Sequence, residues 1–288
     1  MQIPGSAPVI VGVHGTAAGL AAVRSGAREA VARGTELRIL HAFTWPGPSR
    51  HAPPRGYAAA RHEAQRIVDE AVHTARRSTP GVHASGSVVD GPATRVLVQY
   101  SRTADLMVLA DEDLCTTPRV PLDSVLLQTV SHAWCPVMVS RGLRPPSGPL
   151  LVAVDGSPNA LRALHYAAAE AARREVPVEI VHVVERSGAA AENLAREILA
   201  AATAEVPELR GSTTTVLTGD PGPVLVRASR HARAVIVGPR GHDGAMLLGP
   251  VAQHLLRWCA CPCVFVHRAG ADDPMPAEPM AREHVSLT

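Results

Sequence analysis

The sequence contains one series of strand-like and loop-like segments twice, and this internal repeat constrains the fold more than any other feature. Residues 9–16 (VIVGVHGT) match residues 150–157 (LLVAVDGS). Further matches follow in the same order, pairing 37–42 with 178–183, 91–98 with 221–226, 105–110 with 234–238, and 134–139 with 260–265. A chain of 288 residues is also long enough for two domains of ordinary size. We therefore predict two tandem copies of one domain.

Within each copy, short β-branched runs alternate with alanine-rich amphipathic stretches. The first copy predicts strands at 9–14, 36–42, 83–89, 105–110 and 136–140, and helices at 17–33, 57–78, 92–102 and 123–132. The second predicts strands at 150–155, 177–183, 212–218, 234–238 and 262–267, and helices at 158–174, 189–205, 221–231 and 249–258. Apolar strands separated by helices are typical of a parallel sheet that is covered on both faces. The predicted fold is α/β, with two tandem doubly wound five-stranded parallel-sheet domains of the nucleotide-binding type.

Proline and glycine at 141–149 indicate a linker, which places one domain at residues 1–143 and the other at 149–268. Residues 269–288 are rich in Pro, Asp and Glu, and we expect them to form a disordered tail. The last strands of the copies, near 137–140 and 263–267, would expose sheet edges. We expect them to pair with each other in an intramolecular pseudo-dimer, and a homodimer of whole chains is left open.

Composition narrows the functional classes. All 28 basic residues are arginine, the formal net charge is +2, and no dense basic run is present, which argues against nucleic acid as a partner. No apolar run approaches the roughly 20 residues of a membrane span, so no membrane association is expected. The five cysteines and the lack of a signal-like N-terminal stretch lead us to expect a cytoplasmic protein.

In an open α/β sheet, ligands bind beyond the carboxyl ends of the strands, where the strand order reverses. In the second copy, Asp155 follows the first strand and the glycine-rich segment 238–244 follows the fourth. Glycines and a helix N-terminus present backbone N–H groups to an anion, and Arg240 can add a charge-assisted bond to a phosphate. The Asp155 carboxylate can accept hydrogen bonds from a base or a sugar. The competing interpretation is a glycine-rich turn that binds nothing.

Both copies resemble the universal stress protein family over nearly the whole chain apart from the tail. The resemblance is carried by Val-Asp-Gly-Ser at 154–157, the histidine near the end of the second strand, Gly-Pro-Arg-Gly-His at 238–242, and Cys-Pro at 261–262. The family's ATP signature is two glycines separated by two residues, then nine residues, then Gly-Ser or Gly-Thr. The resemblance implies that Asp155 contacts the adenine, that Val183 lines its pocket, and that the loop glycines and the Val251 N–H contact the phosphates. The candidate nucleotide-binding residues are Ala153, Asp155, Val183, Gly238, Arg240, Gly241, His242, Gly249 and Val251.

The second copy departs from the family signature at the phosphate end. Gly249 follows Gly241 after seven residues instead of nine, and Pro250 replaces the Ser or Thr. Proline supplies neither a hydroxyl nor an N–H, so two donors are lost. The expected ligand is ATP or another adenine nucleotide, with or without Mg²⁺, and the departures favour weak ATP binding or a smaller nucleotide.

The first copy keeps the signature's spacing, but its glycines are replaced by Ala110, Asp113 and Asp123. With Asp111 and Glu112, these carboxylates would repel a polyphosphate, and His14 replaces the adenine-contacting aspartate. We expect this copy not to bind ATP in the family's manner. A divalent cation on the acidic residues and a solvated acidic loop both stay open, with the loop favoured.

Other reactive residues have simpler interpretations. Cys259, Cys261 and Cys263 lie near His254 and His267, but the spacing is not that of a zinc site, and alternate strand residues point to opposite faces. We expect buried small side chains there, with a metal or redox role as the alternative. His41 and His182 are expected to be structural, and Ser157 lacks an activating His and acid.

The expected function is therefore a stress-response regulatory module that is not an enzyme and has neither catalytic residues nor a metal site. It would bind an adenine nucleotide through its second domain. A scaffold that binds no nucleotide and acts through protein contacts is the main alternative, and a slow ATPase is a third.

Overall fold

The computed structural model describes residues 7–45, 56–111, 121–142, 147–240 and 247–267. In the first half the strands are β1 (Val9–Gly12), β2 (Leu37–Phe43), β3 (Ala84–Asp90), β4 (Leu106–Ala110) and β5 (Val137–Ser140). The helices between them are α1 (Ala17–Arg33), α2 (Tyr57–Ser78), α3 (Ala93–Ser101) and α4 (Val125–His132).

The second half repeats this order. Its strands are β6 (Leu150–Ala153), β7 (Val178–Val184), β8 (Thr213–Thr218), β9 (Ala234–Val237) and β10 (Cys263–Phe265). Its helices are α5 (Pro158–Arg174), α6 (Ala189–Glu205), α7 (Pro221–Ala228) and α8 (Pro250–Trp258), with short 3-10 turns η1 (Pro207–Leu209) and η2 (Ser229–His231). The predicted α/β class and element order are confirmed.

The predicted element bounds differ from the observed ones mainly at strand ends. Strands predicted at 9–14 and 150–155 end at Gly12 and Ala153. Val13 and Val154 still donate to the Leu40 and Val181 carbonyls of the neighbouring strands before the chain continues to helices α1 and α5. The strand predicted at 262–267 is confined to β10. The helix predicted at 221–231 ends at Ala228 and tightens into η2, as helix C-termini commonly do.

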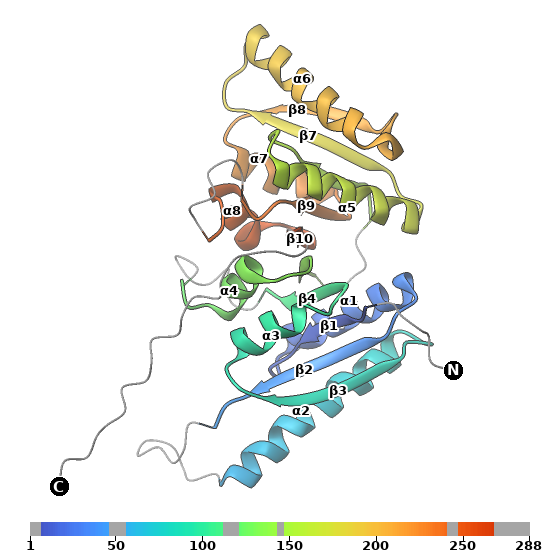
Figure 1. Cartoon of the computed structure of the whole chain (residues 1–288), viewed down its shortest axis with the longest axis vertical. Coiled ribbons are helices and arrows are strands. Elements are labelled where there is room, and N and C mark those ends of the chain that lie inside the picture. The colour runs from blue at the N-terminus through green and yellow to red at the C-terminus, as the bar shows by residue number, and fades with distance from the viewer. Residues whose placement is uncertain (1–6, 46–55, 112–120, 143–146, 241–246, 268–288) are drawn as a thin grey trace, which may run out of the picture.

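Across the described residues the strands form one ten-stranded sheet in the order β3-β2-β1-β4-β5-β10-β9-β6-β7-β8. Pairing is parallel within each half, and the halves join where β5 and β10 pair antiparallel, with Met138 opposite Val264. Figure 1 shows the halves one above the other, with β3 and β8 toward the outer ends. The intramolecular pairing predicted for the last strands is confirmed. This pairing joins the two predicted five-stranded sheets into one continuous sheet.

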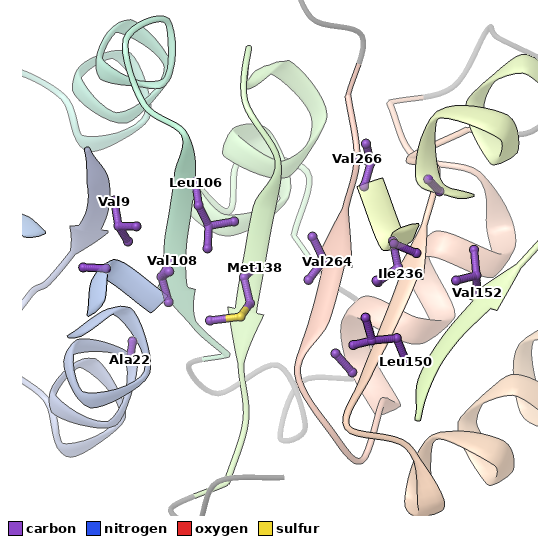
Figure 2. Packing of buried hydrophobic residues seen from close by; sticks show 14 of the residues in the cluster. Val9, Ala22, Leu106, Val108, Met138, Leu150, Val152, Ile236, Val264 and Val266 are labelled. Carbon is purple, nitrogen blue, oxygen red and sulfur yellow. The ribbon is translucent and has the colours of Figure 1, made fainter. Parts of the chain in front are cut away.

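The hydrophobic core also continues across the seam, which is the line along which β5 and β10 join the two halves. One cluster of buried residues lies under α1, α2, α5 and α6, and a second lies under α3, α4, α7 and α8. Figure 2 shows Val108, Met138, Val264 and Ile236 side by side on neighbouring strands, in the first cluster. Because residues of both halves share each cluster, the halves are expected to support one another's stability.

Helix α1 shows how local sequence sets its position on the sheet. Thr16 accepts a hydrogen bond from the Gly19 N–H at 3.1 Å and caps the helix N-terminus. Gly34 ends the helix in the left-handed conformation, with φ of 64°. A side chain at Gly26 would come within 2.3 Å of Val11, so glycine there lets α1 lie close on β1. Within the described ranges, no helix combines the length and apolar character that a membrane crossing requires.

Candidate functional site

A cavity of about 360 Å³ lies at the carboxyl ends of β6, β7 and β9, where the strand order of the second half reverses. Its lining includes these candidate residues from the sequence: Ala153, Asp155, Val183, Gly238, Arg240, Gly249 and Val251. Gly241 and His242 lie outside the described residues. The structure therefore brings the describable candidates together at the predicted end of the sheet.

The turn after β6 places Asp155 at the cavity and uses Ser157 to start α5. One carboxylate oxygen of Asp155 accepts a hydrogen bond from the Ser157 N–H at 2.9 Å, and Asp155 itself is exposed. Ser157 is 2 % exposed, and its hydroxyl accepts from the Ala160 N–H at 3.2 Å. Ser157 is thus a helix cap, like Thr16 in the first half.

The loop after β9 is tied to α5 by a residue that the sequence analysis missed. Asn159 donates a hydrogen bond from its amide to the Arg240 carbonyl at 2.8 Å. A side chain at Gly238 would come within 2.6 Å of the Asn159 Cβ, so only glycine allows this approach. The first half has Ala18 and Ala110 at the equivalent positions. Both contacting positions thus differ between the copies, and this joint change could have pointed to Asn159 from the sequence alone.

The same loop closes on itself before α8 begins. Gly249 donates its N–H to the Pro239 carbonyl at 2.9 Å, and Arg240 Nε donates to the Leu247 carbonyl at 3.2 Å. Gly249 therefore lines the cavity with its backbone, but its N–H is engaged within the loop.

Helix α8 points its N-terminus at the cavity. Pro250 occupies its first position and has no N–H, which leaves Val251 and Ala252 as first-turn donors that line the cavity. The helix dipole places partial positive charge there, and Arg240 adds a full positive charge to the lining. This end of the cavity is suited to an anion.

The paired histidines His41 and His182 have the same role in both halves. His182 Nδ1 hydrogen-bonds the Val154 carbonyl at 2.8 Å, and His41 Nδ1 hydrogen-bonds the Val13 carbonyl at 2.9 Å. Each ring fixes the chain that leaves the first strand of its half. This geometry agrees with the structural role that the sequence suggested.

The first half has a cavity of about 350 Å³ at the equivalent place, lined largely by apolar side chains and by His14. Asp111 does not stand alone there, because its carboxylate pairs with Arg141 at 2.9 Å. Ser124 caps α4, and Glu112 and Asp113 lie outside the described residues. In the described part of the chain, no three His, Cys, Asp or Glu side chains gather as metal ligands.

Cys259, Cys261 and Cys263 are all buried in the same core cluster, with the sulfurs of Cys259 and Cys261 4.0 Å apart. The expectation that they point to opposite faces is wrong, because Cys261 and Cys263 are two residues apart and share one face. Burial raises the pKa of the Cys263 thiol. His254 packs against Gly222, and His267 hydrogen-bonds the Val130 carbonyl. The cysteines are therefore core side chains, as the sequence suggested.

Comparison with known proteins identifies the family. The model described as "Universal stress protein family" matches residues 6–141 and 147–267. Universal stress protein Rv2623 of Mycobacterium tuberculosis is 32 % identical over 294 residues, covering 91 % of this chain and 96 % of that protein. Universal stress protein Rv2005c of the same organism is 30 % identical, covering 91 % of this chain and 97 % of that protein.

Solved structures agree with this fold. The crystal structure of a universal stress protein from Archaeoglobus fulgidus DSM 4304 aligns with a TM-score of 0.69 at 17 % identity, covering 91 % of this chain and 97 % of that one. A second, from Pseudomonas aeruginosa UCBPP-PA14, gives a TM-score of 0.56 at 16 % identity, covering 90 % and 93 %. The chain therefore belongs to the universal stress protein family, with two of the family's domains in tandem.

Proposed function

We propose that this protein is a stress-response regulatory module that binds an adenine nucleotide in the cavity of its second half. The observation that carries the proposal is the composition of that cavity. One carboxylate, an apolar wall, an arginine and a helix N-terminus line about 360 Å³ at the switch point of the sheet. Small-molecule sites commonly combine a mostly apolar wall with a few polar groups in volumes of roughly 300–1,000 Å³.

The base would lie against the apolar wall, which is formed by Val181, Val183, Leu225 and Val237. A flat heteroaromatic ring gains from burial on such a surface. Asp155 lies at the same cavity and accepts hydrogen bonds, so it suits the exocyclic amine of adenine or a ribose hydroxyl.

The phosphates would lie at the N-terminus of α8, near Val251, Ala252 and Arg240. Pro250 has no N–H, and the Gly249 N–H already bonds the Pro239 carbonyl, so the described residues of the loop and of α8 offer few donors for a long phosphate chain. Each missing charge-assisted bond weakens binding by about 1.5–3 kcal/mol, or one to two decades of affinity. The proposed preference is therefore for a nucleotide with one or two phosphates over ATP.

The proposed role is binding and regulation in the cytoplasm, without catalysis. Ser157, the hydroxyl nearest to Asp155 in sequence, is buried and caps α5. A hydrolase would need an activated nucleophile or a positioned base at the phosphates.

Isothermal titration of the whole chain with ATP, ADP, AMP and cyclic AMP tests the proposal. We expect one nucleotide per chain and tighter binding of AMP or ADP than of ATP. Val183→Trp, which fills the second-half cavity, should abolish binding. Ala42→Trp is the matched control, because Ala42 lines the first-half cavity at the equivalent position.

The scaffold alternative is favoured by the same two features at α8, Pro250 and the engaged Gly249 N–H. No heat with any of the four nucleotides would contradict the binding proposal and support the scaffold. Loss of binding in Ala42→Trp alone would place the site in the first half instead.

A further inference from the structure

A third cavity, of about 120 Å³, lies on the seam between the halves, apart from both switch-point cavities. It is lined by α1, by β5 and the residue after it, by α5, and by the chain around β9 and β10. Its charged lining residues are Arg28, Glu29, Arg141, Glu170, Arg174 and Arg233. Arginines therefore outnumber carboxylates around a small space that both halves line.

The two carboxylates are already neutralised by arginines. Glu29 and Arg33 on α1 occupy the positions that Glu170 and Arg174 occupy on α5. Arg33 pairs with Glu170 at 2.5 Å, and Arg174 pairs with Glu29. Within each helix, Arg33 also lies 3.6 Å from Glu29, and Arg174 lies 3.0 Å from Glu170. These two arginines and two glutamates balance one another's charge. They do not neutralise the remaining arginines of the cavity, which are Arg28, Arg141 and Arg233.

The repeat breaks down at one position, and the break adds a positive charge. Asp105 directly precedes β4 and pairs with Arg33 at 2.5 Å. The equivalent residue before β9 is Arg233, which lines the cavity together with Arg174. In the first half, Arg33 therefore has Asp105 as a partner. In the second half, the equivalent Arg174 has Arg233 beside it in the cavity wall, and two positive charges lie where the first half has an ion pair. Arg233 Nε is buried without a hydrogen-bond partner.

Two arginines of the first half complete the positive lining. Arg141 is 8 % exposed, and its Nε has no hydrogen-bond partner, although its terminal nitrogens reach Asp111 and the Leu256 carbonyl. Arg28 donates to the Ser25 hydroxyl at 3.1 Å. Burial lowers the pKa of Arg28, as expected for a cation that lacks full compensation. Buried arginine groups without partners are costly, and an anion would satisfy them.

The size of the cavity limits which anion can enter. A volume of about 120 Å³ is well below the roughly 300–1,000 Å³ of ordinary small-molecule sites, which suits a small oxyanion and not a nucleotide. The Tyr166 phenol also lines the cavity, and burial raises its pKa, so its hydroxyl keeps a proton to donate. Arginine forks match the oxygens of a tetrahedral oxyanion.

We propose that this seam cavity binds one free inorganic oxyanion of the phosphate class. Arg28 and Arg141 hold it from the first half, and Arg233 holds it from the second. Because the anion contacts both halves, it binds the folded chain and not the unfolded one, and so stabilises the joined sheet.

Thermal unfolding of the whole chain tests this site, with inorganic phosphate compared with chloride at equal ionic strength. The melting temperature should rise with phosphate concentration and saturate. Arg233→Gln should weaken the apparent phosphate affinity by about tenfold or more, through the loss of a charge-assisted bond. Arg230→Gln is the matched control, because Arg230 is exposed three residues earlier and lies outside the cavity.

A second variant keeps the test decisive if Arg233→Gln folds poorly. Arg233→Asp supplies the carboxylate that Asp105 supplies in the first half, so it should melt higher than wild type in chloride and no longer respond to phosphate. Phosphoserine separates free phosphate from phosphate carried on a larger molecule, and the volume predicts a response to inorganic phosphate alone. An equal response to phosphoserine contradicts the proposal.

Two further results would overturn the proposal: no effect of phosphate beyond that of chloride, or an undiminished effect in Arg233→Gln. The response should survive Val183→Trp, which fills the nucleotide cavity. This arm separates the seam site from the proposed nucleotide site, and either proposal can fail without the other.

Discussion

Arg33 on α1 and Glu170 on α5 form an ion pair of 2.5 Å across the seam between the halves, with the two side chains only 4 % and 5 % exposed. The pair joins helices that are far apart in sequence and lie on the same face of the sheet. A buried pair of this kind is costly to break, because removing one partner leaves the other charge uncompensated.

Glu170→Gln should therefore lower the free energy of unfolding by about 3 kcal/mol, measured by urea denaturation. Breaking a buried ion pair costs about 3–5 kcal/mol. We expect the low end of this range, because Arg33 keeps Glu29 and Asp105 as partners. Glu192→Gln is the control, because Glu192 pairs with Arg196 on the surface, where a pair contributes at most about 1 kcal/mol. Equal effects of the two changes would contradict a structural role for the seam ion pair.

Stability should fall in mild acid because His267 is buried and neutral. Burial lowers the pKa of His267 from its ordinary 6.5 to about 4, and the neighbouring charge of Arg240 acts in the same direction. The unfolded chain therefore binds a proton near pH 6.5, whereas the folded chain does so only near pH 4. The contribution of neutral His267 to the free energy of unfolding is therefore complete above pH 6.5. As the pH falls from 6.5 toward 4, the free energy of unfolding drops by up to about 3 kcal/mol.

Urea denaturation of His267→Gln across this pH range checks the effect. Glutamine can still donate to the Val130 carbonyl but does not titrate, so its unfolding free energy should vary less with pH between 6.5 and 4. Identical pH profiles for the variant and the wild type would show that another group causes the acid sensitivity.

Asn159→Ala should weaken nucleotide binding without unfolding the protein. It removes the hydrogen bond that holds the Arg240 carbonyl and thus the loop beside the cavity. We expect about a tenfold rise in the dissociation constant for AMP, measured by calorimetry. Asn193→Ala on the exposed face of α6 is the control, and a similar loss there would rule out a specific role for Asn159.

Pro250→Ser should strengthen ATP binding relative to AMP. Serine restores one hydroxyl and one backbone N–H at the first position of α8, which adds donors for the outer phosphates. A gain of about tenfold in ATP affinity is expected from one charge-assisted bond. Pro207→Ser in η1 serves as the control, and an unchanged preference in Pro250→Ser would show that proline does not limit ATP binding.

Much of the fold follows from local patterns that the sequence displays directly. The repeat and the alternation of apolar runs with amphipathic stretches predicted the element order, and the bounds of α1, α2, α5 and α6 agree with the structure. The pairing of β5 with β10 was predictable because an exposed edge must be covered. Because β5 pairs with β10, the two halves share one sheet and their core clusters contain residues of both halves.

The ion pairs at the seam and the hydrogen bonds within the loop after β9 could not be predicted from local sequence patterns. Arg33 and Glu170 are 137 residues apart, and no local pattern couples them. The engagement of the Gly249 N–H by Pro239 depends on how the loop closes, which composition does not specify. Arg233 is recognised as exceptional only when Asp105 is seen to hold Arg33 at the equivalent position.

Calorimetric titration of the wild-type chain and of Val183→Trp with AMP is the decisive measurement for the nucleotide site in the second half. We expect one AMP bound per wild-type chain and no binding to Val183→Trp, while Ala42→Trp binds as the wild type does. Absence of heat with the wild type, or undiminished binding to Val183→Trp, would contradict this expectation.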